Sequence, residues 1–426
     1  MAPETDTNRP FTRTDALSLD AADPLRAMRN RFDLPADGVY LDGNSLGPLP
    51  RGVVEAVNQT LRHEWGTRLI RSWNEADWFA SSHRVGAMVA PLIGASGHEV
   101  VVCDSLSVNL FKCMSAALRM QAGSGQRARR VIVSEVGNFP SDAYINQGAA
   151  ATFGATVVDV DPKDVEAAIA DAGDDLAVVQ LTHVHYKTGN VYDMGAITEL
   201  THRHGGLSMW DLAHSAGALP VALNECNVDF AAGCGYKYLN GGPGAPGFVF
   251  VAERHHAGLS QPISGWYGHA NPFAFDHSFS PGPGMGPMLV GTPPIISIVA
   301  LEAALKLWAD VDMGELRIKS VAMGDLFLRL VDERLHAYGF GVASPRNASK
   351  RGSQVSLTHP EGYSIMQALI ARGIIGDFRA PEILRFGFTP LYLSYAEVWD
   401  AVDALVDIMT TSAWDTPEFR VRNAVT

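Results

Sequence analysis

One lysine of this sequence stands where its amine could act as a nucleophile. Lys237 lies in GCGYKYLNGGPGAPGFVF (residues 233–250), where an apolar run gives way to a glycine-rich turn. It is one of seven lysines in the chain, and no opposite charge lies near it in sequence. An amine becomes nucleophilic when its surroundings disfavour the charged form, as in Schiff-base lysines. A lysine that reaches the surface from a strand end would look the same locally, so both interpretations stay open here.

An aspartate placed 26 residues before Lys237 favours covalent chemistry. Asp211 closes the apolar run GLSMW in LSMWDLAHSAG (207–217). A buried carboxylate there is costly unless a cation or a donor faces it, and the protonated ring nitrogen of pyridoxal phosphate is such a partner. Taken alone, Asp211 could equally cap the helix that follows. The order of the two residues, an acid closing one strand and a lysine closing a later one, is what favours a cofactor site.

The elements that position these residues follow an alternating pattern. Between residues 98 and 252, short β-branched runs alternate with helical segments, which predicts a mostly parallel sheet covered by helices on both faces. Ligands of such sheets bind at the carboxyl ends of the strands. Several predicted strands end in polar residues, which we expect to converge at one edge: Ser105, Ser107, Asn138, Asp142, Thr182, His183, His185, Asp211, His214 and Lys237.

The rest of the chain divides into an arm, a long loop and a smaller lobe. Residues 260–294 are rich in Gly, Pro and aromatic residues, and loops of that length are usually functional. A long amphipathic stretch at about 294–338 leads to a lobe with strand signals at GSQVSLTH and ILRFGFTP. We expect an α/β protein with an N-terminal arm and loop (1–50), a large cofactor-binding domain (51–310) and a small α+β domain (311–426).

Composition excludes several classes of function. The 426 residues are 47% apolar and carry a net charge of -13, which argues against a nucleic-acid partner. The four cysteines show no CxxC spacing, so neither a zinc site nor a disulfide framework is indicated. The N-terminus has no apolar signal region, and no apolar run approaches the length of a membrane span. We therefore expect a cytoplasmic protein.

Nine motifs, in order and spread over most of the chain, resemble the kynureninase pattern. They are YLDGNSLGPLP (40–50), LIRSWN (69–74), SLSVNL (105–110), NFPSD (138–142), HYKTG (185–189), WDLAHSAG (210–217), GYKYLNGGPG (235–244), GWYGH (265–269) and GTPPI (291–295). The resemblance implies the fold of pyridoxal-phosphate-dependent transferases (fold type I), in the class V branch of the aspartate-aminotransferase fold.

The same resemblance implies roles at the cofactor ring. Lys237 would carry pyridoxal phosphate through its amine, and Asp211 would pair with the ring nitrogen. Phe139 would stack on the ring, and Asp142 would lie close to the ring and its hydroxyl, although a simple turn would also satisfy the composition of GNFPSD. Thr182 and His214 match positions that line the cofactor. 

The phosphate group needs hydrogen-bond donors. The strand and helix start at DSLSVNL supply free backbone N–H groups, and the resemblance places Leu106 and Ser107 there. Tyr236 matches a tyrosine that contacts the phosphate and transfers protons. Trp266 and Thr292 match residues that reach the phosphate from the neighbouring subunit, which implies a homodimer with shared active sites.

Two further positions concern the substrate. Arg385 in ILRFGFTP matches an arginine that binds the substrate α-carboxylate, a task that suits a planar guanidinium. Ser45 matches a loop residue near the substrate. The chain departs from some family members at Thr292, where they carry Asn, and in EWGTRLIRSWN (64–74), which offers no counterpart to a histidine near their arylketone. Both departures bear on which ring substituents are accepted.

The implied reaction is hydrolysis of the Cβ–Cγ bond of L-kynurenine, or of a 3-hydroxylated or methylated kynurenine, to an anthranilate and L-alanine. A cysteine desulfurase or selenocysteine lyase is the nearest alternative, but desulfurases of this branch use a cysteine well after the lysine, whereas the last cysteine here is Cys234. A non-catalytic protein that binds pyridoxal phosphate is the other alternative. The preferred ring substitution and the choice between a catabolic and a secondary-metabolite pathway stay open.

Overall fold

The computed structural model describes residues 9–123 and 128–422, which form two units. Of these described residues, the larger unit takes those in the ranges 45–123, 128–186 and 191–313, and the smaller unit those in 9–44, 187–190 and 314–422. Residues 1–8 of the predicted N-terminal arm lie outside the described residues. The predicted division at residues 50 and 310 stays a prediction.

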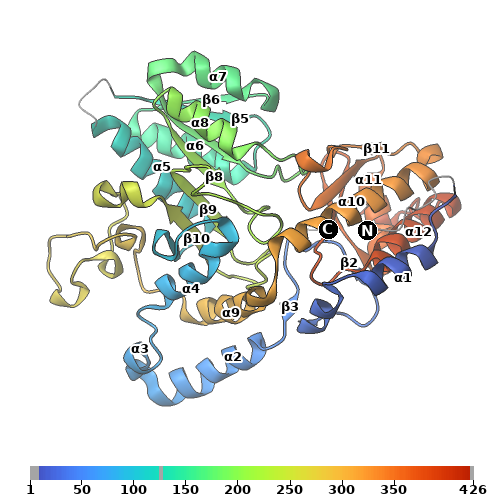
Figure 1. The fold of residues 1–426 in the computed structure, drawn as a ribbon, viewed down its shortest axis with the longest axis horizontal. Coiled ribbons are helices and arrows are strands. Elements are labelled where there is room, and N and C mark those ends of the chain that lie inside the picture. The colour runs from blue at the N-terminus through green and yellow to red at the C-terminus, as the bar shows by residue number, and fades with distance from the viewer. Residues whose placement is uncertain (1–8, 124–127, 423–426) are drawn as a thin grey trace. The chain divides into compact units, whose positions relative to one another are not determined.

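The larger unit is built on a seven-stranded mixed sheet (Figure 1) with the strand order β4-β10-β9-β8-β7-β5-β6. Strand β10 runs antiparallel to both of its neighbours, whereas β9, β8, β7, β5 and β6 are parallel to one another. The strands are β4 (Val100–Val102), β5 (Val131–Glu135), β6 (Thr156–Val160), β7 (Leu176–Thr182), β8 (Leu207–Asp211), β9 (Phe230–Cys234) and β10 (Gly247–Val251). The predicted mostly parallel sheet is therefore confirmed.

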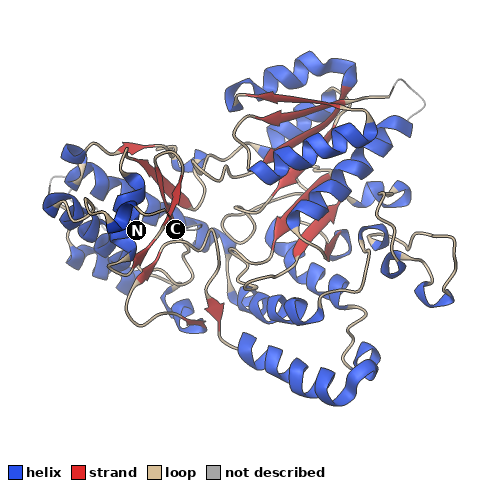
Figure 2. Cartoon of the chain, turned by 180° about the vertical axis from the view of Figure 1, so that it is seen from behind, coloured by secondary structure: helices blue, strands red, loops and turns tan. Residues whose placement is uncertain are grey.

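Burial explains why these strands read as apolar runs. All residues of β7, β9 and β10 are buried, as expected for strands covered on both faces. Figure 2 shows the strands of this unit between layers of helices. The helices are α2 (Val53–Gln59), α3 (Ser72–Glu75), α4 (Ser81–Val89), α5 (Leu106–Gly123), α6 (Pro140–Phe153), α7 (Val165–Ala172), α8 (Met194–Arg203) and α9 (Ile295–Leu305).

The parallel strands bring their polar ends together. The register of β7 and β8 places Thr182 beside Asp211, the last residues of both strands. Strand β9 ends at Cys234, three residues before Lys237. The turns that follow these strands therefore share the carboxyl edge of the sheet, where ligands of parallel sheets bind.

The smaller unit holds a four-stranded antiparallel sheet in the order β11-β12-β15-β14. Its strands are β11 (Gly341–Val342), β12 (Gln354–Thr358), β14 (Asp377–Arg379) and β15 (Ile383–Gly387), and its helices are α1 (Arg13–Ala22), α10 (Met313–Arg334), α11 (Gly362–Ile370) and α12 (Tyr395–Thr411). The short strands β2 (Val39–Tyr40) and β13 (Ile374–Ile375) pair in parallel. The predicted small α+β domain is confirmed in kind.

Two local features modify the sequence expectations. The amphipathic stretch at 294–338 is two helices, α9 and α10, separated by a 3-10 turn at Lys306–Asp310. In the smaller unit, the buried Asp20 carboxylate accepts hydrogen bonds from the first amides of α12, those of Tyr395 (2.6 Å) and Ala396 (3.1 Å).

Within the described residues, no helix is long and apolar enough to cross a membrane.

Helix α4 packs on strand β4 so closely that only glycine fits at the contact. A Cβ at Gly86 would lie 2.2 Å from the Val100 carbonyl oxygen, whereas a Cβ at Gly148 on α6 would meet nothing within 4 Å. We expect Gly86→Ala to lower the free energy of unfolding by about 1–3 kcal/mol because backbone would have to move. The control, Gly148→Ala, should raise it by about 0.5–1 kcal/mol. Urea unfolding measures both, and equal stabilities of the two variants would contradict the packing.

Candidate active site

Lys237 lies in a turn whose backbone is held by neighbouring segments. The Asn240 amide donates to the Lys237 carbonyl (2.9 Å), and the Gly47 amide donates to the Tyr236 carbonyl (2.8 Å). The Lys237 side chain is partly exposed, and its amine lies 5.8 Å from the centre of the Tyr236 ring. Among the described residues, this amine makes no hydrogen bond or ion pair. It is therefore available to a ligand.

Two buried carboxyl groups lie within electrostatic reach of that amine. Asp211 ends β8 and is 2% exposed, and Asp142 in the first turn of α6 is 1% exposed. Burial raises the pKa of Asp211 to about 6, although the Ala213 amide (2.7 Å) and the charge of Lys237 both lower it. Burial and the charge of Asp211 raise the pKa of Asp142 well above its usual value. Two adjacent buried acids are costly unless a cation shares the site.

A buried glutamine orients one of these acids. Gln180, fully buried in the middle of β7, donates from Nε2 to Asp142 Oδ2 (2.9 Å) and accepts from Asn138 Nδ2 (3.3 Å). Asn138 Oδ1 in turn accepts from the Thr182 hydroxyl (2.5 Å) and from the Phe139 amide (2.7 Å). One network therefore holds the predicted cofactor residues Asp142, Thr182 and Phe139. Sequence reasoning missed Gln180, for which the only signal was a polar residue inside the apolar strand.

The unsatisfied atoms of this layer fit the predicted cofactor. Asp142 Oδ1 and His183 Nδ1 are buried and have no hydrogen-bond partner among the described residues. Phe139, the N-cap residue of α6, keeps 42% of its surface exposed. A flat cation over Phe139 that faces Asp211 would offset the cost of the buried acids. The residues present therefore fit a pyridoxal ring with a protonated nitrogen.

The phosphate end of the predicted site lies at the start of α5. Leu106 and Ser107 are the first two residues of this 18-residue helix, where backbone amides point outward and the helix dipole favours an anion. Ser105 and Tyr236 line a common cavity of about 490 Å³ beside this helix start. Burial raises the pKa of the Tyr236 phenol, so its hydroxyl stays protonated and can donate.

Three other predicted residues occupy defined places. His214 is 3% exposed in the turn after β8, with its ring 6.5 Å from that of Tyr238. Ser45 is partly exposed, two residues before Gly47, whose amide binds the Tyr236 carbonyl. Arg385 belongs to the smaller unit, where Asp377 bridges two of its nitrogens, one being Nε (2.8 Å), and thereby fixes the plane of the guanidinium.

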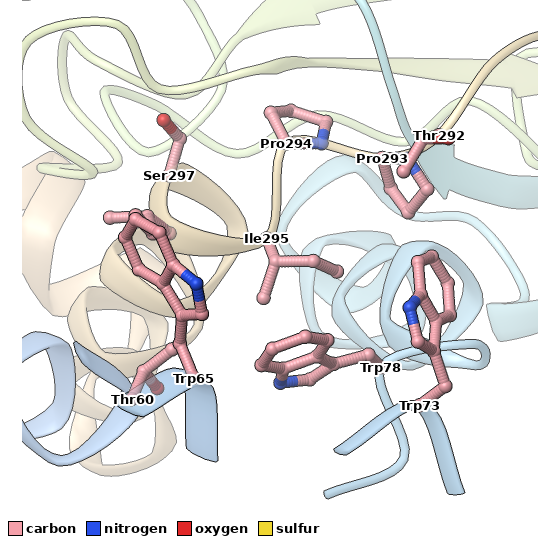
Figure 3. Close-up of a pocket in the computed structure, with 10 residues that line it drawn as sticks. Thr60, Trp65, Trp73, Trp78, Thr292, Pro293, Pro294, Ile295 and Ser297 are labelled. Carbon is pink, nitrogen blue, oxygen red and sulfur yellow. The ribbon is translucent and has the colours of Figure 1, made fainter. Parts of the chain in front are cut away.

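Trp266 and Thr292 lie on an exposed aromatic surface of the larger unit. Trp266 is 38% exposed, and its ring lies 6.4 Å from that of Trp73. Thr292 lines a pocket of about 460 Å³ whose other walls include three tryptophans, Trp65, Trp73 and Trp78 (Figure 3). The sequence expectation for Trp266 and Thr292 concerned the neighbouring subunit, and it stays a prediction.

Comparison with solved structures shows the class of fold. The match to the apo cysteine desulfurase from Thermococcus onnurineus NA1 covers 90% of this chain and 98% of that one, with a TM-score of 0.75 and 19% identity. The match to the cysteine desulfurase CsdA from Escherichia coli covers 95% of this chain and 100% of that one, with a TM-score of 0.74 and 19% identity. This is the aminotransferase class V fold, as predicted.

Sequence relatives then identify the family. Kynureninase from Burkholderia pseudomallei (strain K96243) is 51% identical over 419 residues, which are 97% of this chain and 100% of the relative. Kynureninase from Pseudomonas fluorescens is 50% identical over 418 residues with the same shares. Residues 316–405 match the model of the kynureninase C-terminal domain. The chain belongs to the kynureninase family.

The buried Asp211 carboxyl implies a pH-dependent cost in cofactor-free protein. Because its pKa of about 6 exceeds the ordinary 3.8, the folded state loses stability as the pH rises through this interval. We expect Asp211→Asn to stabilise the cofactor-free protein on the order of 2 kcal/mol at pH 8 and to lose this advantage near pH 4. Urea unfolding across this pH range measures the effect.

Asp229→Asn is the control of opposite sign. Burial disfavours the charge of Asp229, but hydrogen bonds to His202 and His255 outweigh it and hold the pKa well below its usual value. Removal of the Asp229 charge by Asp229→Asn should therefore destabilise the protein at pH 8. If Asp211→Asn were also less stable than the parent protein at pH 8, the proposed cost of burying the Asp211 charge would be wrong.

Proposed function

We propose that this member of the kynureninase family binds pyridoxal 5'-phosphate through Lys237 and hydrolyses the Cβ–Cγ bond of L-kynurenine or a ring-substituted kynurenine. The products would be an anthranilate and L-alanine. One observation carries the proposal: in a chain 51% identical along its length to a kynureninase, a lysine with no ion pair among the described residues lies within electrostatic reach of two buried carboxyl groups. 

Each cofactor-binding residue would have its own role. When bound, pyridoxal phosphate supplies the electron sink for chemistry at the substrate Cα. Asp211 would keep the proton on the ring nitrogen, and a cation there would offset the cost of burying Asp211 and Asp142 together. The amides of Leu106 and Ser107 would hold the phosphate, and Phe139 would fix the plane of the ring.

Two groups are placed to move protons. Among residues 9–123 and 128–422 the Lys237 amine has no hydrogen bond or ion pair, so it can take the Cα proton and return it. The Tyr236 hydroxyl is protonated at neutral pH, and burial raises its pKa further, so it can donate a proton to the substrate Cβ when the Cβ–Cγ bond breaks. General acid and base steps of this kind each contribute about 10²- to 10⁴-fold.

The substrate carboxylate would be bound by Arg385. Its guanidinium carries five donors, and the bridge to Asp377 holds it in one plane, which suits bidentate binding of a carboxylate. Ser45 would contact the substrate from the loop before Gly47. The expected cytoplasmic location stays a prediction.

A persulfide-forming reaction does not fit the cysteines. Cys234, the last cysteine in the chain, is 4% exposed, and burial raises the pKa of its thiol. A nucleophilic cysteine needs an accessible thiolate. The fold shared with cysteine desulfurases therefore does not extend to their chemistry.

A homodimer with shared sites is part of the proposal. Trp266 and Phe273 are 38% and 63% exposed, lie 6.0 Å apart between ring centres, and continue a cluster that includes Trp73 and Phe79. Phe275, 77% exposed, extends the cluster. Contiguous exposed aromatic surface of this kind marks protein interfaces. A second copy of the chain is its proposed occupant, because Trp266 and Thr292 resemble residues that complete a neighbouring site.

Turnover tests the proposed reaction. L-Kynurenine, 3-hydroxykynurenine and a methylated 3-hydroxykynurenine are offered in parallel, and anthranilate release is followed. We expect Lys237→Ala to slow turnover at least about 100-fold because both the cofactor bond and the proton transfer are lost. Lys163→Ala, on an exposed lysine, should match the parent protein. Cofactor-loaded protein that turns over none of the three would refute the proposed function.

Subunit mixing tests the shared site. Lys237→Ala and Trp266→Ala subunits carry different affinity tags, and the mixed dimer is purified through both. If sites are shared, one site of the mixed dimer holds both parent residues, and the rate should be about half that of the parent dimer. If each subunit completes its own site, the rate cannot exceed half that of Trp266→Ala, and the shared-site proposal fails.

A further inference from the structure

Helix α5 contains a lysine with no exposed side-chain surface. Lys112 donates to Asp104 Oδ2 (2.7 Å), to the Met288 carbonyl (2.6 Å) and to Cys103 Sγ (3.3 Å). An ammonium ion has three donors, and all three are used here. A fully buried lysine is rare in proteins and needs paired, hydrogen-bonded surroundings.

The side chain is an ammonium ion at neutral pH. Burial favours the neutral amine, but Cys103 and Asp104 outweigh this effect, and the pKa of Lys112 lies above its usual value. The ammonium ion connects three segments, because it donates from α5 to the Asp104 carboxylate and to the Met288 carbonyl, and its loss removes both of these hydrogen bonds.

The first segment tied by Lys112 leads into the predicted phosphate site. Asp104 has φ of 46°, a left-handed conformation that few residues other than glycine adopt, and it stands directly before Ser105 and Leu106. The Asp104 carbonyl accepts from the Gly247 amide (2.7 Å), and its carboxylate binds Lys112. Strained conformations persist only where neighbours hold them. Lys112 is one of the groups that fix the turn in front of α5.

The second segment supports Trp266, which is predicted to reach the active site of the neighbouring subunit. Met288 is followed by Leu289 and Val290, and the Val290 carbonyl accepts from the Tyr267 amide (3.2 Å). A Cβ at Gly265 would lie 2.1 Å from the same carbonyl, so residues 265–267 pack directly on this segment. Trp266 therefore rests on backbone that Lys112 anchors.

We propose that Lys112 is a positioning residue that ties the phosphate-binding turn of its own subunit to the segment that presents Trp266 and Thr292. The roles of the two segments in cofactor binding rest on the proposed function. The connection between the segments, which we call the tie, rests only on the hydrogen bonds of Lys112. Through this one ammonium ion, a well-ordered turn at residues 104–107 requires a well-ordered segment at residues 265–290. The segment in turn requires the ordered turn.

Amide hydrogen exchange of the cofactor-free protein tests the tie directly. We expect Lys112→Met to speed exchange about tenfold or more in both segments, 104–109 and 265–290. Lys319→Met is the matched control, because Lys319 is also buried, with an aspartate at 2.7 Å (Asp23) and a backbone carbonyl at 2.6 Å (Pro390) in the smaller unit. It should leave exchange in both segments unchanged. Unchanged exchange in Lys112→Met, or equal effects of the two variants, would overturn the proposal.

Asp104→Asn covers the case in which Lys112→Met does not fold. Asn keeps the preference for left-handed backbone but removes the ion pair, and Asp104 is partly exposed. If Lys112 transmits order, exchange should rise at 285–290 although the substitution lies in the other segment, and an unchanged 285–290 segment would overturn the proposal.

Cofactor affinity connects the tie to function. Titration of cofactor-free protein with pyridoxal phosphate, followed by absorbance, should give a dissociation constant about tenfold higher for Lys112→Met and an unchanged one for Lys319→Met. Parent protein that does not bind the cofactor would refute the proposed function, while the exchange experiment would still decide the tie. Equal affinities of parent and Lys112→Met would refute its role in positioning the phosphate turn.

Discussion

The cost of burying two carboxyl groups side by side governs the larger unit. Asp142 and Asp211 are both almost inaccessible to solvent, and the charge of Asp211 raises the pKa of Asp142. A globular protein can keep such a pair only if the rest of the fold over-determines it, or if a cation regularly occupies the place between them. The partly exposed amine of Lys237 supplies part of that positive charge, and a protonated pyridoxal ring would supply the rest.

The fold meets this constraint by placing the acids on different kinds of element. Asp211 ends a strand, and its backbone is fixed by β7 and β9 on either side. Asp142 lies in the first turn of a helix, where amide dipoles favour a negative charge. Gln180 reaches across from β7 to fix the Asp142 side chain, so the acid cannot turn away to solvent. The rigid backbone and the hydrogen-bonded polar layer thus hold both carboxyl groups in place without contact with water.

A second buried charge organises the other end of the site. The ammonium of Lys112 holds a left-handed aspartate in front of α5 and a backbone carbonyl of the 260–294 loop. The long loop is therefore not a passive connector. Its aromatic residues form an exposed surface whose support reaches back to the helix start that would receive the phosphate. In both places, a group that is expensive to bury is used where several segments must keep one geometry.

By itself, the sequence determined the alternation of strands and helices, the class of the sheet, and the order of Asp211 at the end of one strand and Lys237 shortly after a later one. These features are local, because the period of apolar residues and the residue that follows a strand are written in consecutive positions. The motifs were specific enough to indicate the kynureninase family, which the relatives confirm. The order of Asp142, Thr182 and Asp211 along the chain also predicted their convergence, since parallel strands end at one edge.

Only the tertiary structure decided which of these groups touch and which residues hold them. Sequence reasoning singled out neither Gln180 nor Lys112, because their partners are up to 176 residues away. Arg385 was expected at a substrate carboxylate, but its bridge to Asp377 depends on the register of β14 and β15. Contacts of this kind follow from strand register and from packing between distant segments, and neither is encoded in any short stretch of sequence.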